Sequence, residues 1–304
     1  MSSNTKKLII LVIGILLFSC VLNTIFGLSG FKLGLFVKNT SHGEAKTFQV
    51  SGSFSDIDLE SRSGSIRFYP SGDRSAKVVW SGNSAMKFSV RNTGNTLKVR
   101  ESYKLPWFLR PGISSGRATI DIYLPQKDYD ELKAESNTGS ISVPAGFRFS
   151  SAEIETETGQ AEFRSEVSET LKIQTDTGRI TCAGSRLGNL IAESDTGAIS
   201  LSEVRAAEDI KLETDTGKIT LNRVIAADSM ELESDTGSIE LEDCDAEELE
   251  IETDTGSVRG TLLSEKTFSV RSNTGKIDIP ESAPGGSCRI KTDTGSITIR
   301  IKEK

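Results

Sequence analysis

The chain has 304 residues, 43 acidic and 36 basic, and a formal net charge of −7. The acidic balance disfavours a nucleic-acid partner. A single histidine, His42, argues against histidine-based acid–base catalysis and histidine-ligated metals. The four cysteines show no Cys-x-x-Cys spacing, so the sequence also lacks a thiol metal or redox motif.

The N-terminus contains an uncharged apolar segment, residues 8–28, preceded by Lys6 and Lys7. About 20 apolar residues are enough to cross a bilayer as a helix, and cations before the span favour a cytoplasmic N-terminus. We predict that residues 1–28 are a cytoplasmic N-terminus and an uncleaved single-pass transmembrane anchor of the cell membrane. Two alternatives stay open: a lipoprotein attached at Cys20, and a different cleaved signal.

The segment after the anchor changes character twice. Residues 29–45 contain several glycines and serines, which predicts a linker. Residues 46–130 contain short stretches in which apolar and polar residues alternate. This pattern predicts short strands that form an irregular β cap or first turns of a longer β structure.

A short aromatic segment breaks this alternation. It contains Trp107, Phe108 and Leu109, flanked by Lys104 and Arg110. One interpretation is a loop that plugs the open end of the core. The other is a docking surface, because aromatic side chains beside cations suit a lipid interface or a groove on a partner.

The rest of the chain, residues 131–304, is a repeat. A Ser/Thr-Asp-Thr-Gly motif, or a close variant, returns at spacings of 19 or 20 residues. Its nine glycines are Gly139, Gly159, Gly178, Gly197, Gly217, Gly237, Gly256, Gly275 and Gly295. Apolar residues alternate on both sides of each glycine, and the inward-facing parity changes at the glycine.

Each repeat therefore predicts two short strands joined by a corner. Stacked copies predict an all-β, single-chain β-solenoid, similar to a parallel β-helix, with about 20 residues per rung. Right-handed crossovers favour a right-handed coil. We attribute the glycine to a positive φ, and the preceding aspartate to capping of the corner. Arg300, Lys302 and Lys304 predict a charged edge on the final strand.

Carboxylates follow the repeat in two outward-facing columns, four residues before six of the nine glycines and two residues before seven of them. They include Glu193, Glu213, Glu233 and Glu252 in one column, and Asp176, Asp195, Asp215, Asp235 and Asp254 in the other. Stacked like charges repel unless they are solvated, paired or bridged by cations. One interpretation is a solvated face, and the alternative is a site for Ca²⁺ or another divalent cation. No other cofactor is predicted.

Further motifs accompany the repeat. They are the opening segment Val50-Ser-Gly-Ser-Phe-Ser-Asp-Ile57, the strand Tyr123-Leu-Pro125 followed by Tyr129 and Leu132, and the serial Thr-Gly-x-Ile rungs. Together they resemble the adhesin-like β-strand-repeat family, a domain of unknown function in bacterial membrane-anchored proteins. The resemblance covers nearly the whole chain after the anchor. It implies an extracytoplasmic β-solenoid, and some members accompany envelope-stress systems. It supplies no catalytic or binding residues.

We expect a non-enzymatic binding or scaffold module of the bacterial cell envelope, adhesin-like or associated with envelope stress. Its partner would be an envelope protein or a glycan. The alternative is a polysaccharide-active enzyme, because a solenoid can place carboxylates on a strand face. An active site of that kind should break the repeat with a local cluster, whereas the acidic residues here follow the repeat, so no catalytic residue is assigned.

Overall fold

The computed structural model describes residues 45–82, 86–103 and 118–303, which lie in one folded unit, Ser41–Lys304. Within these ranges no helix has the length and hydrophobicity needed to span a bilayer. The predicted anchor, residues 8–28, and the aromatic segment, residues 104–110, lie outside the described ranges.

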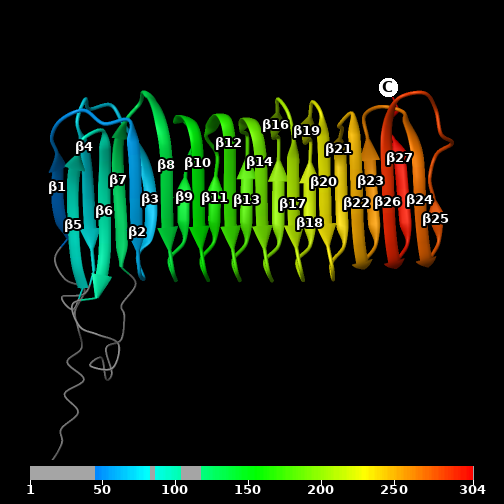
Figure 1. Cartoon of the computed structure of the whole chain (residues 1–304), viewed down its shortest axis with the longest axis horizontal. Helices are drawn as coiled ribbons and strands as arrows, with labels where there is room; N and C mark the ends of the chain where they lie inside the picture. Colours follow the sequence, from blue (N-terminus) through cyan, green and yellow to red (C-terminus); the bar gives the residue numbers. More distant parts are fainter. Residues whose placement is uncertain (1–44, 83–85, 104–117, 304) are drawn as a thin grey trace, which may run out of the picture. The chain divides into compact units, whose positions relative to one another are not determined.

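The described residues form two long sheets (Figure 1). In spatial order the first sheet contains β1 (Lys46–Val50), β4 (Ala76–Ser81), β7 (Thr119–Pro125), β3 (Ser65–Ser71), β9 (Ile141–Val143), β11 (Ala161–Phe163), β13 (Ile180–Ala183), β15 (Ile199–Ser202), β18 (Ile219–Asn222), β21 (Ile239–Cys244), β23 (Val258–Leu262), β27 (Ile297–Ile301) and β25 (Ile277–Asp278). The second contains β24 (Lys266–Thr274), β26 (Gly286–Thr294), β22 (Glu248–Thr255), β20 (Ser229–Ser234), β17 (Ile210–Thr214), β14 (Arg186–Ser194), β12 (Glu166–Thr175), β10 (Arg148–Thr156), β8 (Asp128–Ser136), β2 (Asp56–Ser61), β6 (Thr96–Tyr103) and β5 (Met86–Thr93), with β16 (Arg205–Ala206) and β19 (Ile225–Ala226) continuing from β14.

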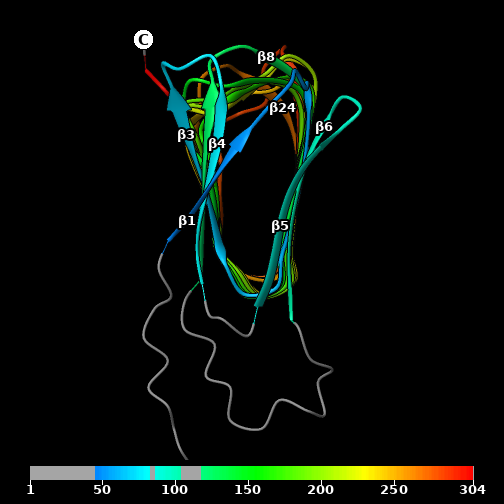
Figure 2. The same cartoon turned by 90° about the vertical axis from the view of Figure 1, so that its left-hand side faces the viewer.

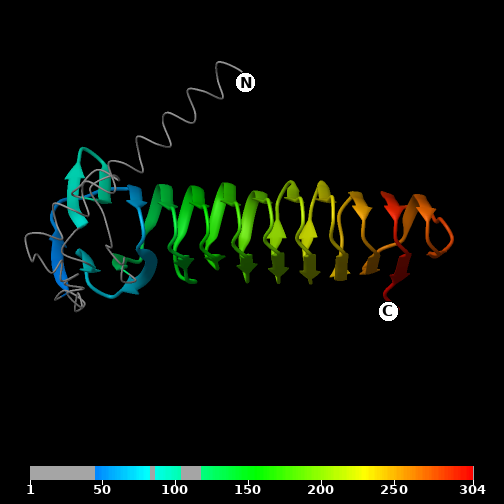
Figure 3. The same cartoon turned by 90° about the horizontal axis from the view of Figure 1, so that it is seen from below.

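Each turn uses one strand of the second sheet, the glycine corner, and one strand of the first sheet. Figure 3 shows the two layers that result. Neighbouring turns pair in parallel and in register, so that Ile173 of β12 lies opposite Ile154 of β10 and Ala192 of β14. The predicted all-β solenoid of about nine turns, with ~20 residues per turn, is confirmed. Its right-handedness stays a prediction.

The core is a stack of apolar side chains between the two sheets. Ile180, Ile199 and Ile219 lie one above the other in β13, β15 and β18, and each is fully buried. Burying an aliphatic side chain of this size contributes about 1.5–3 kcal/mol. Cys182 and Cys244 are free thiols in the same core, and burial raises the pKa of the Cys244 thiol to about 11.

The regular corners are held by the buried hydroxyl three residues before the glycine, and not by the aspartate carboxylate. At Gly256 and Gly295 the glycine N–H donates instead to the carbonyls of Thr294 and Thr274. The Thr214 hydroxyl accepts a hydrogen bond from the Gly217 N–H at 3.0 Å and donates one to the Gly197 carbonyl of the previous turn at 3.1 Å. Thr156 does the same with Gly159 and Gly139. We call this series of contacts the hydroxyl ladder.

The repeated glycines are required by close approach and not by positive φ, which corrects the sequence-based explanation. A Cβ on Gly217 would lie 1.9 Å from the Gly197 carbonyl oxygen, and one on Gly178 would lie 1.6 Å from that of Gly159. Of the nine repeat glycines, only Gly275 has a positive φ, with a value of 157°.

Left-handed backbone occurs instead at the return of the turn, six residues after the glycine. The residues that adopt it have φ between 54° and 63°, namely Gly184, Glu203, Arg223 and Asp243. Three of these four residues carry a side chain, so the return accepts a conformation that costs roughly 1–2 kcal/mol per non-glycine residue.

At the N-terminal end the spatial order differs from the chain order. Strands β2 and β3 stack directly on β8 and β9, with Leu59 opposite Ala134 and Ile66 opposite Ile141. Strands β6 and β7 lie outside them in parallel, and β5, β4 and β1 add antiparallel strands. Figure 2 looks onto this end and shows β1 and β4 on one side, and β5 and β6 on the other.

A buried carboxylate ends the hydroxyl ladder here. Glu101 is 1% exposed, and its side chain accepts from the Ser61 hydroxyl at 2.8 Å and from the Trp80 indole N–H at 2.9 Å. It also accepts from the backbone N–H groups of Ser63 and Gly64. Glu101 therefore takes the place of the glycine carbonyl of a preceding turn, and four donors compensate its burial.

The C-terminal end also departs from chain order. The last turn, β26 and β27, lies between β22/β23 and β24/β25, so that Cys288 is opposite both Leu249 and Phe268. The final strand is covered by β25 only at Ile297 and Thr298, so the predicted charged edge is confined to the segment after Thr298. There Arg300 pairs with Asp278 of β25 at 2.6 Å.

A buried lysine ties the outermost turn to the turn two places inward. Lys266 of β24 is 2% exposed and lies opposite Gly286, which has no side chain to obstruct it. Its ammonium donates to the Ala246 carbonyl at 2.5 Å and pairs with the Asp245 carboxylate at 2.7 Å. The Lys266 side chain therefore passes across the turn formed by β26 and β27, which lies between β24 and β22.

We predict that Gly217→Ala destabilises the protein by on the order of 3 kcal/mol, because the added methyl forces two turns apart. Gly72→Ala is the matched control, since a Cβ there meets no atom within 4 Å. Urea unfolding of the two variants measures the difference. Equal losses would contradict the close-approach explanation.

Candidate functional site

The predicted acidic columns lie on the outer face of the second sheet and at the glycine corners. Pairing places Glu193, Glu213 and Glu233 opposite one another on β14, β17 and β20, and Glu252 follows on β22. The second column occupies exposed corner positions, at Asp176, Asp195, Asp215, Asp235 and Asp254. The structure thus brings the predicted residues into two lines, with one carboxylate per turn in each.

Cations neutralise only part of these columns. The Lys211 ammonium lies 3.0 Å from the Glu231 carboxylate and 3.9 Å from that of Glu213. Partial burial, and then the neighbouring Glu213 and Glu252 carboxylates, raise the pKa of Glu233 above its ordinary value. Repulsion along the column therefore acts against the folded state.

The columns do not gather into a metal centre. In the part of the chain that the structure describes, no group of three or more His, Cys, Asp or Glu side chains is arranged to hold a metal ion. Successive turns are ~4.8 Å apart, whereas Ca²⁺ takes about six to eight oxygen ligands around one point. The calcium site stays a prediction with no coordinating cluster behind it. The predicted interaction residues around Trp107 and Phe108 lie outside the described ranges.

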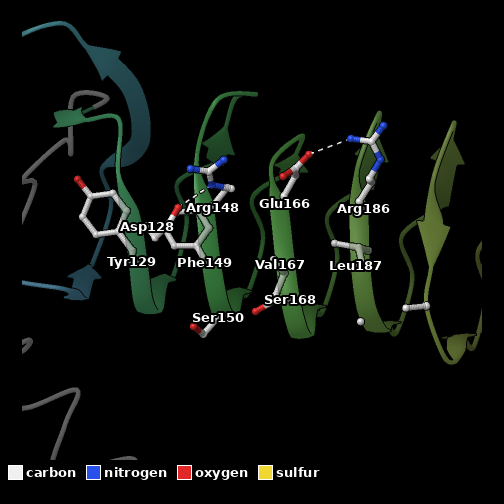
Figure 4. A pocket seen from close by; sticks show the side chains of 12 residues that line it. Asp128, Tyr129, Arg148, Phe149, Ser150, Glu166, Val167, Ser168, Arg186 and Leu187 are labelled. Carbon is white, nitrogen blue, oxygen red and sulfur yellow. Dashed lines mark hydrogen bonds and ion pairs between the residues drawn. The ribbon is translucent and has the colours of Figure 1, made fainter.

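A groove crosses four turns near the start of β8, β10, β12 and β14 (Figure 4). Its volume is about 480 Å³. The pairing of β10 with β12 shifts between Phe149 and Ala152, and that of β12 with β14 shifts between Val167 and Thr170. Such β-bulges bend the strands, which leaves the surface hollow at this level.

The rim of the groove is a row of alternating charges, which we call the charge ladder. The Arg148 guanidinium lies 2.6 Å from the Asp128 carboxylate, and the Arg186 guanidinium lies 3.2 Å from that of Glu166. Pairing also places Arg148 opposite Glu166. The row continues just beyond the residues that line the groove to Arg205 of β16, which lies directly opposite Arg186. Figure 4 shows the two ion pairs along the rim.

The floor of the groove is apolar but closely packed. Tyr129, Phe149, Val167 and Leu187 line it, and each is at most 4% exposed. The Tyr129 hydroxyl donates to the Pro125 carbonyl at 2.8 Å, and burial raises the pKa of this phenol. Ser150 and Ser168 add hydroxyl groups on the side away from the rim.

Sequence reasoning missed this groove because the bulges disturb the repeat there. Asp128, Arg148, Glu166, Arg186 and Arg205 are separated by 20, 18, 20 and 19 residues. Counted from the glycines they fall at different offsets, so no column was visible. The alternation of charge at near-repeat spacing is the signal that could have found them.

The two carboxylates of the groove do not form an acid–base pair. Asp128 and Glu166 each pair with an arginine, and their side chains are 77% and 45% exposed. Glycan hydrolysis by two carboxylates requires one to protonate the leaving oxygen and the other to act on the sugar or on water. The groove offers contact surface and charge, and no such pair of unengaged groups.

The sequence matches a described protein family over most of its length. The family described as Toastrack DUF4097 matches residues 54–190 and 185–304. Among curated proteins, none matches this sequence significantly.

Three solved structures are similar to this chain over nearly their whole length. A "putative adhesin" from Bacteroides fragilis shares 14% identity, covers 86% of this chain and 98% of its own, and has a TM-score of 0.47. A "putative adhesin" from Parabacteroides distasonis shares 11% identity, with coverages of 84% and 97% and a TM-score of 0.39. A "putative lipid binding protein" from the same organism shares 13% identity, with coverages of 86% and 98% and a TM-score of 0.30. At such identities and scores, these likenesses carry no conclusion about function.

We predict that Glu233→Gln stabilises the protein at pH 7 by about 0.5 kcal/mol, because it removes one member of a repelling column. The folded state holds the Glu233 proton at pH values where the unfolded chain has released it, so the wild type gains stability as the pH falls toward the ordinary value of 4.5. The advantage of the variant should therefore disappear at about pH 4. Urea unfolding at both pH values measures it, and a wild type at least as stable as the variant at pH 7 would contradict the expectation.

Proposed function

The chain belongs to the Toastrack DUF4097 family, and we propose that it is a non-enzymatic binding or scaffold module of a bacterial cell envelope. Its anchor is the apolar segment 8–28, and the solenoid lies on the extracytoplasmic side of the cell membrane. Its partner is an extended component of the envelope. Both an adhesin-like role and a role beside an envelope-stress system fit this description.

One observation carries the proposal: the functional groups are spread along the solenoid by turn, and do not converge on a point. The charge ladder runs across successive turns, as do the acidic columns on another part of the surface. Parallel pairing in register holds these groups at a constant spacing of ~4.8 Å. A rigid array of this kind suits repeated contacts to a long partner, whereas catalysis needs groups focused on one bond.

The location rests on the sequence of the N-terminus. Residues 8–28 contain no charge, and Lys6 and Lys7 precede them. A span of this length can cross the hydrocarbon core, and cations on its N-terminal side orient it with the following chain outside.

The location is tested with the full chain carrying a C-terminal tag, expressed in a bacterium, beside the same chain without residues 8–28. The full chain should sediment with membranes, and protease added to spheroplasts should remove its tag. The deletion variant should not sediment. A tag that resists protease until the cells are lysed would place the solenoid in the cytoplasm and overturn the proposed location.

The binding role is tested with insoluble envelope polysaccharide. The full chain in detergent should co-sediment with purified cell-wall sacculi and with capsular polysaccharide coupled to beads, more than with uncoupled beads. No new reducing ends should form during incubation. Appearance of reducing ends in proportion to protein would instead support the polysaccharide-active enzyme.

A further inference from the structure

The end of the charge ladder carries an uncompensated positive charge. Arg186 and Arg205 lie directly opposite each other on paired strands, and like charges in this position destabilise a sheet. Arg186 is partly relieved by Glu166. Arg205 is exposed, and its side chain makes no hydrogen bond or ion pair in the part of the chain that the structure describes, although its backbone N–H donates to the Ser185 carbonyl.

The neighbouring carboxylates are already engaged elsewhere. Glu203 pairs with Arg223 of the next turn. Glu208 accepts a hydrogen bond from the Asn189 side chain at 2.6 Å. No acidic group of the described ranges therefore neutralises Arg205, and its guanidinium stands free beside Arg186, the last arginine that lines the groove.

The acidic columns do not screen this position from an anion. On β14, Arg186 and Glu193 are seven residues apart, which corresponds to roughly 23 Å along the strand. Charges lose most of their influence over about 8–10 Å at physiological ionic strength. The arginine end of the groove is therefore electrostatically independent of the acidic face.

The form of the groove selects among anionic partners. A membrane surface is bound through exposed large apolar side chains, but the floor residues are at most 4% exposed, and Ile277, near the far end of the solenoid, is the single exposed large apolar residue in the described ranges. An acidic peptide would add itself to a free strand edge, but β10, β12 and β14 are paired on both sides. A polymer lying across the strands meets neither obstacle.

We propose that the groove binds an acidic polysaccharide, with a carboxylate held between Arg186 and Arg205. The polymer lies along the solenoid axis above the closely packed floor, where the exposed hydroxyl of Ser168 contacts it. The planar guanidinium of each arginine offers paired N–H donors to a carboxylate. An anion at this point relieves the repulsion between the two arginines. This assignment rests on the proposed binding function and names its ligand class and site.

The test uses the full chain in detergent and measures its affinity for polygalacturonate, with fully methyl-esterified polygalacturonate as the uncharged comparison. Arg205→Glu should weaken binding to polygalacturonate at least tenfold, the size of a lost charge-assisted hydrogen bond. Arg205→Lys should weaken it less. Arg259→Glu is the matched control. Arg259 is exposed on the first sheet and lies away from the groove, so its substitution changes the net charge by the same amount without altering the site. The esterified polymer should bind at least tenfold more weakly than the acid form.

Equal effects of Arg205→Glu and Arg259→Glu would overturn the assignment, because they would reduce the interaction to net charge. Failure to bind polygalacturonate, with binding to cell-wall sacculi retained, would overturn the ligand class and leave the envelope function standing. Binding to phosphatidylglycerol vesicles that is lost in Arg205→Glu, without binding to polygalacturonate, would replace the polysaccharide by a lipid headgroup. Loss of both polygalacturonate and sacculus binding in the wild type would overturn the ligand assignment and the proposed function together.

Discussion

The contact between a buried hydroxyl and the glycine of the preceding turn is the constraint on which the solenoid depends. Thr214 shows this contact in its regular form. Its hydroxyl accepts a hydrogen bond from the Gly217 N–H of the same corner and donates one to the Gly197 carbonyl of the preceding turn. The approach is possible only because neither corner has a Cβ. Every later property follows from this spacing, including the register of the inward columns and the alignment of the outward charges.

Sequence reasoning reached the period, the two strands per turn and the inward columns, because each is a local pattern of apolar side chains such as Ile219. Sequence reasoning identified the repeated glycine but attributed it to a positive φ, whereas the cause is close approach to the neighbouring turn. A sequence indicates that a Cβ is not tolerated at a position, but it does not show which atom the Cβ would clash with. The order of the terminal turns was out of reach, because β24 and β26 present similar inward faces and either could follow β22. The groove was hidden because its bulges shift the charged residues out of the repeat frame.

The groove and the acidic columns differ in whether neighbouring turns place opposite charges or like charges next to each other. Along the groove, opposite charges alternate, so Arg148 and Glu166 stabilise each other across strands. Along the column of Glu213, Glu233 and Glu252, like charges face one another, and partial burial together with these neighbouring carboxylates raises the pKa of Glu233. The alternation of charge along the groove stops between Arg186 and Arg205, where two cations face each other. This interruption of the repeat therefore marks the place where the surface is suited to bind an anion.

The inserted position of β26 and β27 has a consequence for how the protein is made. The ribosome releases β24 and β25 before the final residues, yet in the finished molecule the final turn separates them from β22 and β23. If β24 docks on β22 before β26 is made, it must move outward by one turn to admit β26, because in the finished structure β22 and β24 both pair with β26 and not with each other. Removal of β26 and β27 would therefore take out an interior layer and not the tip, and Lys266 would take a new position relative to Ala246.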